Sequence, residues 1–332
     1  MNLFPVEYGI DLIEQHADRL EGAVVITQPE VWSTVSARAG NAKPAHVEMA
    51  EDLSPEGLAD LLGRLPRRPI VGIGGGVAMD VAKWLHWRTG ASLTQIPGLP
   101  SVNACFTRMT ALRDGGIVRY EGDAVPDVVL VDFSLMRSAP IEMLRAGIGD
   151  VLSCHTARFD WELAVAEGHS PDWDEEAASA SKSYLAELES AAPGIREGSD
   201  EGIMRLMELH REIGWRCHAL GHARFEEGSE HFFAYCFEEV TGRTILHGEI
   251  VTLGVLVMST VQRNDPLRAM AIADAAGTRH KIDELGISWD ETTATLRRLP
   301  AFAREGGYWE SMAQRMSLTP ELIAEIEAAV RS

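Results

Sequence analysis

Residues 71–83 read Val71-Gly-Ile-Gly74-Gly75-Gly76-Val-Ala-Met-Asp80-Val-Ala-Lys83, an apolar run that leads into three glycines and then into a helical pattern. The apolar, partly β-branched start is typical of a buried strand, and the apolar residues after the glycines recur at helical spacing. This order suits a phosphate site, because glycines let a ligand approach the backbone and the following helix offers unpaired N–H groups. A tight strand-to-helix connection without a ligand is the alternative interpretation.

The segments around this stretch predict an α/β domain built on a mostly parallel sheet. Because apolar, strand-like runs alternate with helical patterns, the strands should run parallel. The ligand site should then lie at their carboxyl ends, where the glycines fall. The expected strands span residues 23–27, 45–49, 69–73, 92–97 and 125–132, the expected helices span 11–20, 30–37, 55–65 and 77–86, and a hairpin turn is expected at 113–116.

From about residue 139 the pattern changes to helical periodicity with few strand-like runs. We therefore expect a nucleotide-binding α/β domain over residues 1–139 and an all-helical, metal-binding domain over residues 140–332. The helices of the second domain are predicted at 141–157, 173–191, 201–220, 229–240, 247–263, 266–275 and 320–330.

Composition restricts the classes of function. The 332 residues are 45% apolar, which is enough for a sizeable core. Thirty Lys and Arg against fifty Asp and Glu give a formal charge of -20, which argues against nucleic acid or an anionic membrane as the main partner. The four cysteines are dispersed and form no CxxC pair, and we find neither a signal sequence nor an apolar run of about 18 residues. We expect a cytoplasmic protein that does not insert into membranes.

Three residues of the helical half could form a metal site. Asp150, His231 and His247 lie on three different predicted helices and offer one carboxylate and two imidazoles. Oxygen and nitrogen ligands of this kind suit Zn²⁺ or Fe²⁺ and leave room for water or substrate. Spacing alone does not show that they converge, and in a chain with eleven histidines the alternative for each is an ordinary core or surface residue.

The motifs together resemble a known superfamily. Gly74-Gly-Gly-x-x-x-Asp80-x-Ala-Lys83 is followed by Gly147-x-Gly-Asp150, Gly228-Ser-Glu-His231 and His247-Gly-Glu249. Their order and spacing are similar to those of the dehydroquinate synthase-like superfamily, which includes the iron-containing alcohol dehydrogenases. Within it, segments 149–164 and 224–231 most resemble the sn-glycerol-1-phosphate dehydrogenases, and the similarity spans about residues 20 to 260.

The resemblance implies a Rossmann-like first domain, a helical second domain and an active site in the cleft between them. It implies an NAD(P)-dependent, metal-containing dehydrogenase that reduces dihydroxyacetone phosphate to glycerol 1-phosphate, usually with zinc. Asp150, His231 and His247 would bind the metal, and the glycines would hold the pyrophosphate of NAD or NADP. Asp80 and Lys83 would support the glycine loop or reach the ligand. The candidate cofactor residues are Thr27, Gln28, Gly74, Gly75, Gly76, Asp80, Lys83 and Pro97.

A phosphate substrate would need a local cation in so acidic a protein. Arg224, just before the Gly-Ser-Glu-His segment, is the first candidate, and Lys83 is the second. A solvated or structural salt bridge is the alternative for Arg224. With Asn103, these residues are the candidate catalytic groups.

Several positions depart from the superfamily pattern. Asn103 stands where related enzymes place an Asp near the substrate, which leaves the substrate open. Tyr235 or a neighbour replaces a second histidine, which leaves the proton route open. Cys154 lies one helical turn after Asp150, where the alcohol dehydrogenases have a fourth ligand, although a buried thiol is the alternative. Thr27 and Gln28 place no carboxylate against a 2′-phosphate, so we expect NADP to be accepted.

Two other functions stay open. One is a dehydroquinate synthase-like sugar-phosphate cyclase, a lyase that uses bound NAD and a divalent metal. Those enzymes usually have Glu in place of Asp150 and a Lys/Arg-rich phosphate pocket, so this chain argues against it. The other is a catalytically silent relative, against which the intact ligand set argues. We expect a small-molecule substrate, a phosphorylated or polyol ketone, and a homo-oligomeric enzyme.

Overall fold

The computed structural model describes residues 4–114, 117–170 and 172–331. The chain divides into two compact units, Met1–Leu144 with His210–Ala219, and Arg145–Leu209 with Leu220–Ser332. These are called unit 1 and unit 2. The domain boundary expected at residue 139 stays a prediction.

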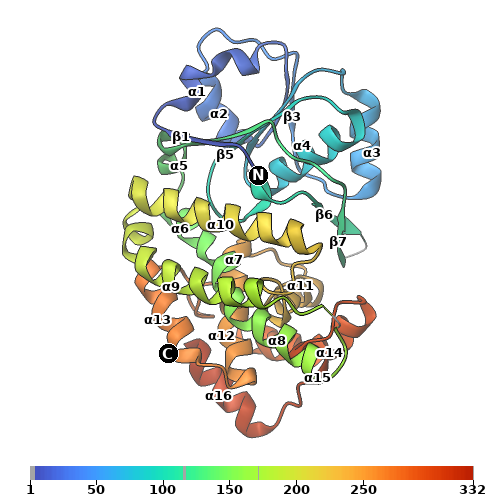
Figure 1. Cartoon of the computed structure of the whole chain (residues 1–332), viewed down its shortest axis with the longest axis vertical. Coiled ribbons are helices and arrows are strands. Elements are labelled where there is room, and N and C mark those ends of the chain that lie inside the picture. The colour runs from blue at the N-terminus through green and yellow to red at the C-terminus, as the bar shows by residue number, and fades with distance from the viewer. Residues whose placement is uncertain (1–3, 115–116, 171, 332) are drawn as a thin grey trace. The chain divides into compact units, whose positions relative to one another are not determined.

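Unit 1 is built on a six-stranded parallel sheet (Figure 1). Helices α2 (Pro29–Arg38), α3 (Pro55–Arg64) and α4 (Gly76–Thr89) connect its successive strands, as the alternating pattern predicts. The expected α/β class is therefore confirmed. From one edge to the other the strands are β1 (Val6–Gly9), β8 (Val128–Asp132), β5 (Leu93–Pro97), β4 (Ile70–Gly74), β2 (Val24–Thr27) and β3 (His46–Met49).

Strand β1 was not predicted. It has four residues, none of them fully buried, so it lacks the apolar run that marks an interior strand. It forms at the sheet edge because its backbone pairs with β8, with Val6 opposite Val129. Only the tertiary fold brings these two segments together.

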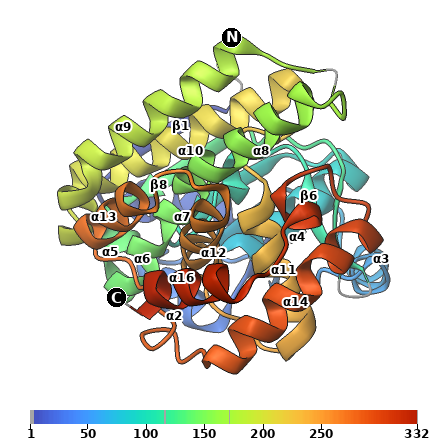
Figure 2. The ribbon, with the colours of Figure 1, turned by 90° about the horizontal axis from the view of Figure 1, so that it is seen from below.

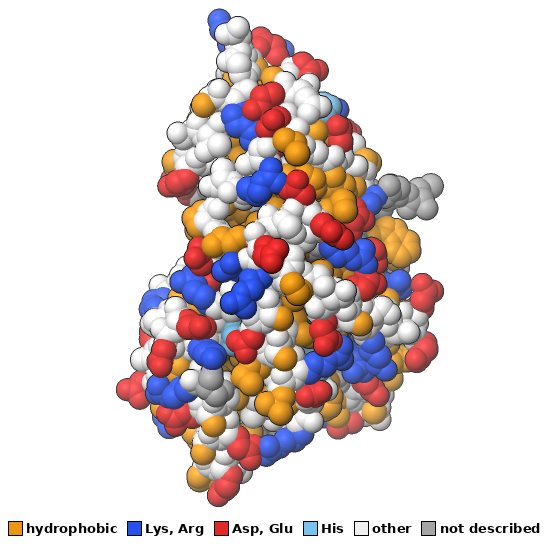
Figure 3. All heavy atoms as spheres, turned by 90° about the vertical axis from the view of Figure 1, so that its left-hand side faces the viewer, with side chains coloured by type: hydrophobic (Ala, Val, Ile, Leu, Met, Phe, Trp, Pro, Cys, Tyr) orange, Lys and Arg blue, Asp and Glu red, His pale blue; other side chains and the backbone are white. Residues whose placement is uncertain are grey.

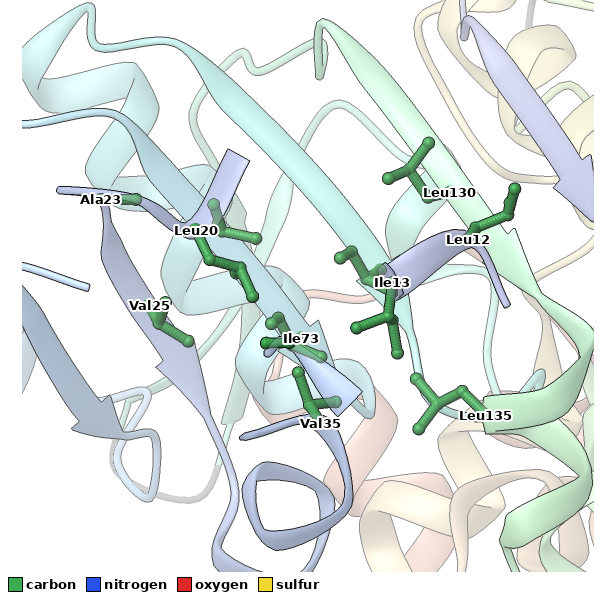
Figure 4. Close-up of a cluster of buried hydrophobic side chains, with 12 residues drawn as sticks. Leu12, Ile13, Leu20, Ala23, Val25, Val35, Ile73, Leu130 and Leu135 are labelled. Atoms are coloured by element: carbon green, nitrogen blue, oxygen red, sulfur yellow. The ribbon is translucent and has the colours of Figure 1, made fainter. Parts of the chain in front are cut away.

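The core of unit 1 lies between the sheet and the first helices. The helix expected at 11–20 is instead two short elements, α1 (Leu12–Gln15) and a 3-10 helix (Ala17–Leu20), separated by His16. Both elements pack apolar side chains against the sheet. Figure 4 shows part of this cluster, with Leu12, Ile13, Leu20, Ala23, Val25, Val35, Ile73, Leu130 and Leu135 labelled.

The sheet has one point where the strand order reverses. From β2 the chain moves outward to β3, and from β4 it moves in the opposite direction to β5 and then β8. The reversal therefore lies between β2 and β4, which are neighbours in the sheet. In open parallel sheets, ligands bind at the carboxyl ends of the two strands that flank such a point.

A two-stranded antiparallel hairpin accompanies the main sheet. Strands β6 (Thr110–Asp114) and β7 (Ile117–Glu121) pair in this hairpin, so the expected reversal of the chain near residue 113 is confirmed. The expected turn residues Gly115 and Gly116 themselves lie outside the described residues.

The described residues of unit 2 form helices joined by loops, with no strand among them (Figure 2). Helix α12 (His247–Gln262) is its centre, since every residue from Gly248 to Gln262 is buried. It packs against α7 (Gly149–Leu152), α11 (Ser229–Thr241), α13 (Pro266–Ala276) and α16 (Pro320–Arg331). The other helices include α8 (Cys154–Ala166), α9 (Glu175–Glu197) and α15 (Met312–Arg315), and α10 (Asp200–Leu220) begins in unit 2 and continues into unit 1.

The helical half differs in several places from what the sequence pattern predicts. The single helix expected at 141–157 is instead three short elements, α6 (Ile141–Arg145), a 3-10 turn (Ala146–Ile148) and α7, followed by the longer helix α8. Helix α14 (Trp289–Glu305) was missed, although Ser288 and Glu291 form a capping box at its start.

On the face drawn in Figure 3, acidic and basic side chains lie among one another and do not separate into patches of one sign. In the part of the chain that the structure describes, no helix has both the length and the apolarity needed to cross a membrane.

Candidate metal centre and cofactor loop

The three predicted metal ligands converge within unit 2. Asp150 lies on α7, His231 is in the first turn of α11, and His247 is the first residue of α12. Their ligand atoms all lie within 4.8 Å of one another. The Asp150 Oδ1 atom is 3.4 Å from His247 Nε2 and 3.9 Å from His231 Nε2.

This donor set fits a divalent ion. Ligands about 2.0–2.2 Å from a tetrahedral zinc ion are roughly 3.4 Å apart, so the carboxylate and imidazoles need only small movements. Asp150 and His231 are buried, whereas the His247 side chain is 28% exposed. Three protein ligands would leave the fourth position of a tetrahedral ion for water or substrate.

Glycines allow the ligand-bearing helices to approach one another. A Cβ atom on Gly149, next to Asp150, would lie only 2.4 Å from the Gly248 carbonyl oxygen, next to His247. A Cβ atom on Gly254 would lie 2.5 Å from the Glu230 carbonyl oxygen. The backbones of α7, α11 and α12 are thus in direct contact, which places their side chains around a common point.

Several further acidic residues surround Asp150, His231 and His247. Burial lowers the pKa of the His231 imidazole. The neighbouring carboxylates, Glu230 first among them, have the larger opposite effect and raise this pKa to about 10. Burial raises the pKa of Glu226 to about 8, with Asp150 adding to the effect. This excess of acidic groups around the imidazoles is an environment that favours a bound cation.

The acidic residues just before His231 were not predicted as part of a site. Glu226, Glu227 and Glu230 are all buried, which is uncommon for Glu without partners. Tyr235, one helical turn after His231, donates its hydroxyl hydrogen bond to Glu227 Oε1 at 3.0 Å. The sequence holds a signal for these glutamates, because three of the five residues 226–230 are Glu and the residues that follow are mostly apolar.

Cys154, the position of a possible fourth ligand, is not part of the converging group found among the described residues. Burial, and then the carboxylates of Glu226, Glu230 and Asp150, raise the pKa of the Cys154 thiol well above its usual value. Cys154 is fully buried, and whether its thiol approaches a bound metal stays open.

The glycine loop lies at the reversal point of the sheet in unit 1. Gly74 ends β4 with a φ of +141°, which favours glycine, and Gly75 caps helix α4. The Gly75 N–H donates a hydrogen bond of 2.9 Å to Gln28 Oε1, and Gln28 directly follows β2. Thr27 and Pro97 end β2 and β5 at the same edge of the sheet.

Asp80 and Lys83 form a buried pair below the loop. Lys83 Nζ is 2.7 Å from Asp80 Oδ1 and donates to Thr107 Oγ1 at 2.8 Å and to the Met109 carbonyl at 2.5 Å. The Lys83 side chain is fully buried. Of the two roles expected for Lys83, these contacts favour support of the loop structure; reaching a phosphate would require breaking them.

The remaining two candidates lie in different units. Asn103 is half-buried in unit 1, and its carbonyl accepts a hydrogen bond from Phe106 N at 2.8 Å. Arg224 is half-buried in unit 2, with its guanidinium 5.3 Å from the centre of the Trp309 ring. Its buried Nη1 has no hydrogen-bond partner among the described residues, so Arg224 keeps a donor for an anionic ligand.

Replacing Gly75 by Val should weaken nicotinamide binding about tenfold or more, a change of about 1.4 kcal/mol. Gly75 has a φ of -86°, and a Cβ atom added there would meet only Gln28 atoms at 3.7 Å, so the fold should tolerate the change. The side chain would instead obstruct a pyrophosphate that approaches the helix terminus. Fluorescence titration with NADH measures the effect, and unaltered affinity would mean that the triplet is only a turn.

Comparisons with known proteins agree with the expected relationship. No protein-family model matches the chain. The NAD(P)+ glycerol-1-phosphate dehydrogenase of Hyperthermus butylicus is 28% identical over 84% of this chain and 81% of its own length. Further glycerol-1-phosphate dehydrogenases, such as that of Thermoplasma volcanium at 29% identity over 71% of this chain and 67% of its own, show the same relationship.

Solved structures show the same fold at lower identity. Glycerol dehydrogenase from Schizosaccharomyces pombe superposes with a TM-score of 0.71 at 19% identity, over 99% of this chain and 90% of that one. An iron-containing alcohol dehydrogenase superposes with a TM-score of 0.63 at 16% identity, over 99% of this chain and 98% of that one. The expected resemblance and the expected fold class are both confirmed.

Proposed function

We propose that this chain, a relative of the glycerol-1-phosphate dehydrogenases by sequence and of the iron-containing alcohol dehydrogenases by fold, is a metal-dependent NAD(P)H oxidoreductase. It reduces a small hydroxyketone or its phosphate, with dihydroxyacetone phosphate as the first substrate to test. The observation that carries this proposal is the convergence of Asp150, His231 and His247 within 4.8 Å in such a fold. A glycine loop at the reversal point of a parallel sheet supplies the matching cofactor site.

Different residues have different roles in this proposal. Asp150, His231 and His247 would hold the metal, which would supply a Lewis acid for the substrate carbonyl and for developing alkoxide charge. The glycine loop and the start of α4 bind the cofactor pyrophosphate through backbone N–H groups. Arg224, which keeps a buried donor, is the candidate cation for a substrate phosphate.

Several finer properties belong to the same proposal. The nitrogen and oxygen donors suit zinc, with Fe²⁺ as the alternative. NADPH as well as NADH is accepted, since Gln28 places an amide and no carboxylate after β2. Free thiols at all four cysteines fit a cytoplasmic enzyme. A homo-oligomeric state is part of the proposal and is tested by light scattering.

Removing the metal should abolish the activity, and restoring zinc should recover it. The assay follows the absorbance of NADH and of NADPH with dihydroxyacetone phosphate or dihydroxyacetone, using zinc-loaded and chelated protein side by side. Metal-dependent oxidation of either cofactor supports the proposal. The relative rates show which cofactor and which of the two substrates the enzyme prefers. Bound metal without any net nicotinamide oxidation would overturn it, and co-purified NAD would then point to a cyclase.

A further inference from the structure

Helix α8 is hydrogen-bonded to the segment just before His231, and each contact involves one buried carboxylate, Glu230 or Asp160. Thr156 and Asp160 lie one turn apart on α8. Thr156 Oγ1 donates to Glu230 Oε2 at 2.7 Å, and Asp160 Oδ2 accepts from Ser229 N at 2.9 Å and from Ser229 Oγ at 2.5 Å. Both residues that precede His231 are therefore attached to the same helix face.

Glu230 is fully buried and has contacts on both carboxylate oxygens. Its Oε1 accepts from Gly228 N at 2.6 Å and lies 2.9 Å from His231 Nδ1, while its Oε2 accepts from Thr156. A carboxylate at this position accepts hydrogen bonds, so the His231 Nδ1 must carry a proton. The lone pair of the neutral imidazole is then on Nε2, the atom that faces Asp150.

We propose that Glu230 is a positioning residue that holds the His231 imidazole with Nε2 toward Asp150 and His247, and that Thr156 in turn holds Glu230. The inference rests on the proposed metal site. Carboxylates that accept from the second nitrogen of a metal-binding histidine orient the ring and increase its basicity as a ligand. Thr156 extends this chain of contacts to α8, a helix that carries none of the three converging ligands.

A purely structural role is the competing explanation. Glu230 accepts from Gly228 N at the start of α11, and a carboxylate there would also stabilise the helix terminus. Such a role would change the stability of the protein without changing the affinity for metal. The two explanations are therefore separated by measuring both quantities on the same variants.

The test compares zinc affinity, by chelator competition, with the free energy of unfolding of the metal-free protein. We expect Glu230→Ala to lower zinc affinity about 10- to 100-fold, and Thr156→Val, which keeps the shape of the side chain, to lower it in the same direction by a smaller factor. Glu230→Gln keeps an acceptor for Nδ1–H and should recover most of the loss. In zinc-loaded wild type, ¹⁵N NMR should show His231 protonated at Nδ1.

Ser229→Ala is the matched control. It removes the hydroxyl contact with Asp160 from the same turn of α11 but leaves Glu230 and Thr156 intact. We expect it to lower stability with zinc affinity unchanged.

The outcomes separate this inference from the proposed function. If the wild type binds zinc but Glu230→Ala and Thr156→Val bind it as tightly, the inference is overturned. It is overturned as well if Ser229→Ala weakens zinc binding as much as Thr156→Val does. If Glu230→Ala does not fold, the Thr156→Val and Ser229→Ala pair decides the question. Failure of the wild type itself to bind metal would overturn the proposed function and the inference together.

Discussion

His231→Ala should lose the metal and ketone reduction while the chain keeps its fold. His231 is one of three converging ligands, and its removal leaves one carboxylate and one imidazole, so we expect metal affinity to fall by at least about 100-fold. The variant also leaves Glu230 without its contact to Nδ1, which should cost about 1–3 kcal/mol of stability because that carboxylate is buried. Metal analysis after dialysis, NADH absorbance and circular dichroism measure the three effects.

The exposed His169 provides the control for this variant. It lies outside the converging group, so His169→Ala should keep both metal content and activity. An unchanged metal content in His231→Ala would contradict the assignment of the metal site. A loss of the far-ultraviolet signal would instead show that His231 is needed for folding.

Gly149→Ala should destabilise unit 2 and weaken metal binding. The Gly149 backbone is helical, with a φ of -54°, so the local conformation accepts alanine. The added Cβ would lie 2.4 Å from the oxygen and 2.7 Å from the Cα of Gly248, and backbone atoms cannot rotate away as a side chain can. Helix α7 would have to move from α12, at a cost of about 1–3 kcal/mol or more, and would carry Asp150 away from His247.

Denaturant unfolding of the metal-free protein and zinc competition measure these changes. Gly63→Ala in α3 is the control, because its Cβ would meet no atom within 4 Å and alanine favours a helix by up to about 1 kcal/mol. Wild-type stability and zinc affinity in Gly149→Ala would mean that α7 and α12 do not lie this close in solution.

The local sequence pattern was sufficient to predict most of the secondary structure. The glycine turn, the parallel strands and the long helices follow from periodicity and from the residues at their ends, which are properties of neighbouring positions in sequence. Strand β1 was missed because its four residues carry little pattern of their own and become a strand only beside β8. The break of the expected 141–157 helix into short elements was missed because helical spacing continues across it.

For the candidate site, too, some features could be predicted from the sequence and others appear only in the folded structure. Residue types, their order and their spacing were enough to predict the parallel α/β part, the helical part, the glycine loop and the nitrogen and oxygen donors of a metal site. The folded structure was needed to show that Asp150, His231 and His247 converge, that Lys83 is buried against Thr107 and Met109, and that Glu230 lies against the His231 ring. The convergence of the ligands and the burial of Lys83 depend on the packing of segments that are distant in sequence, which no local pattern encodes. Glu230 and His231 are neighbours in sequence, and their contact depends on how the folded chain orients the two side chains.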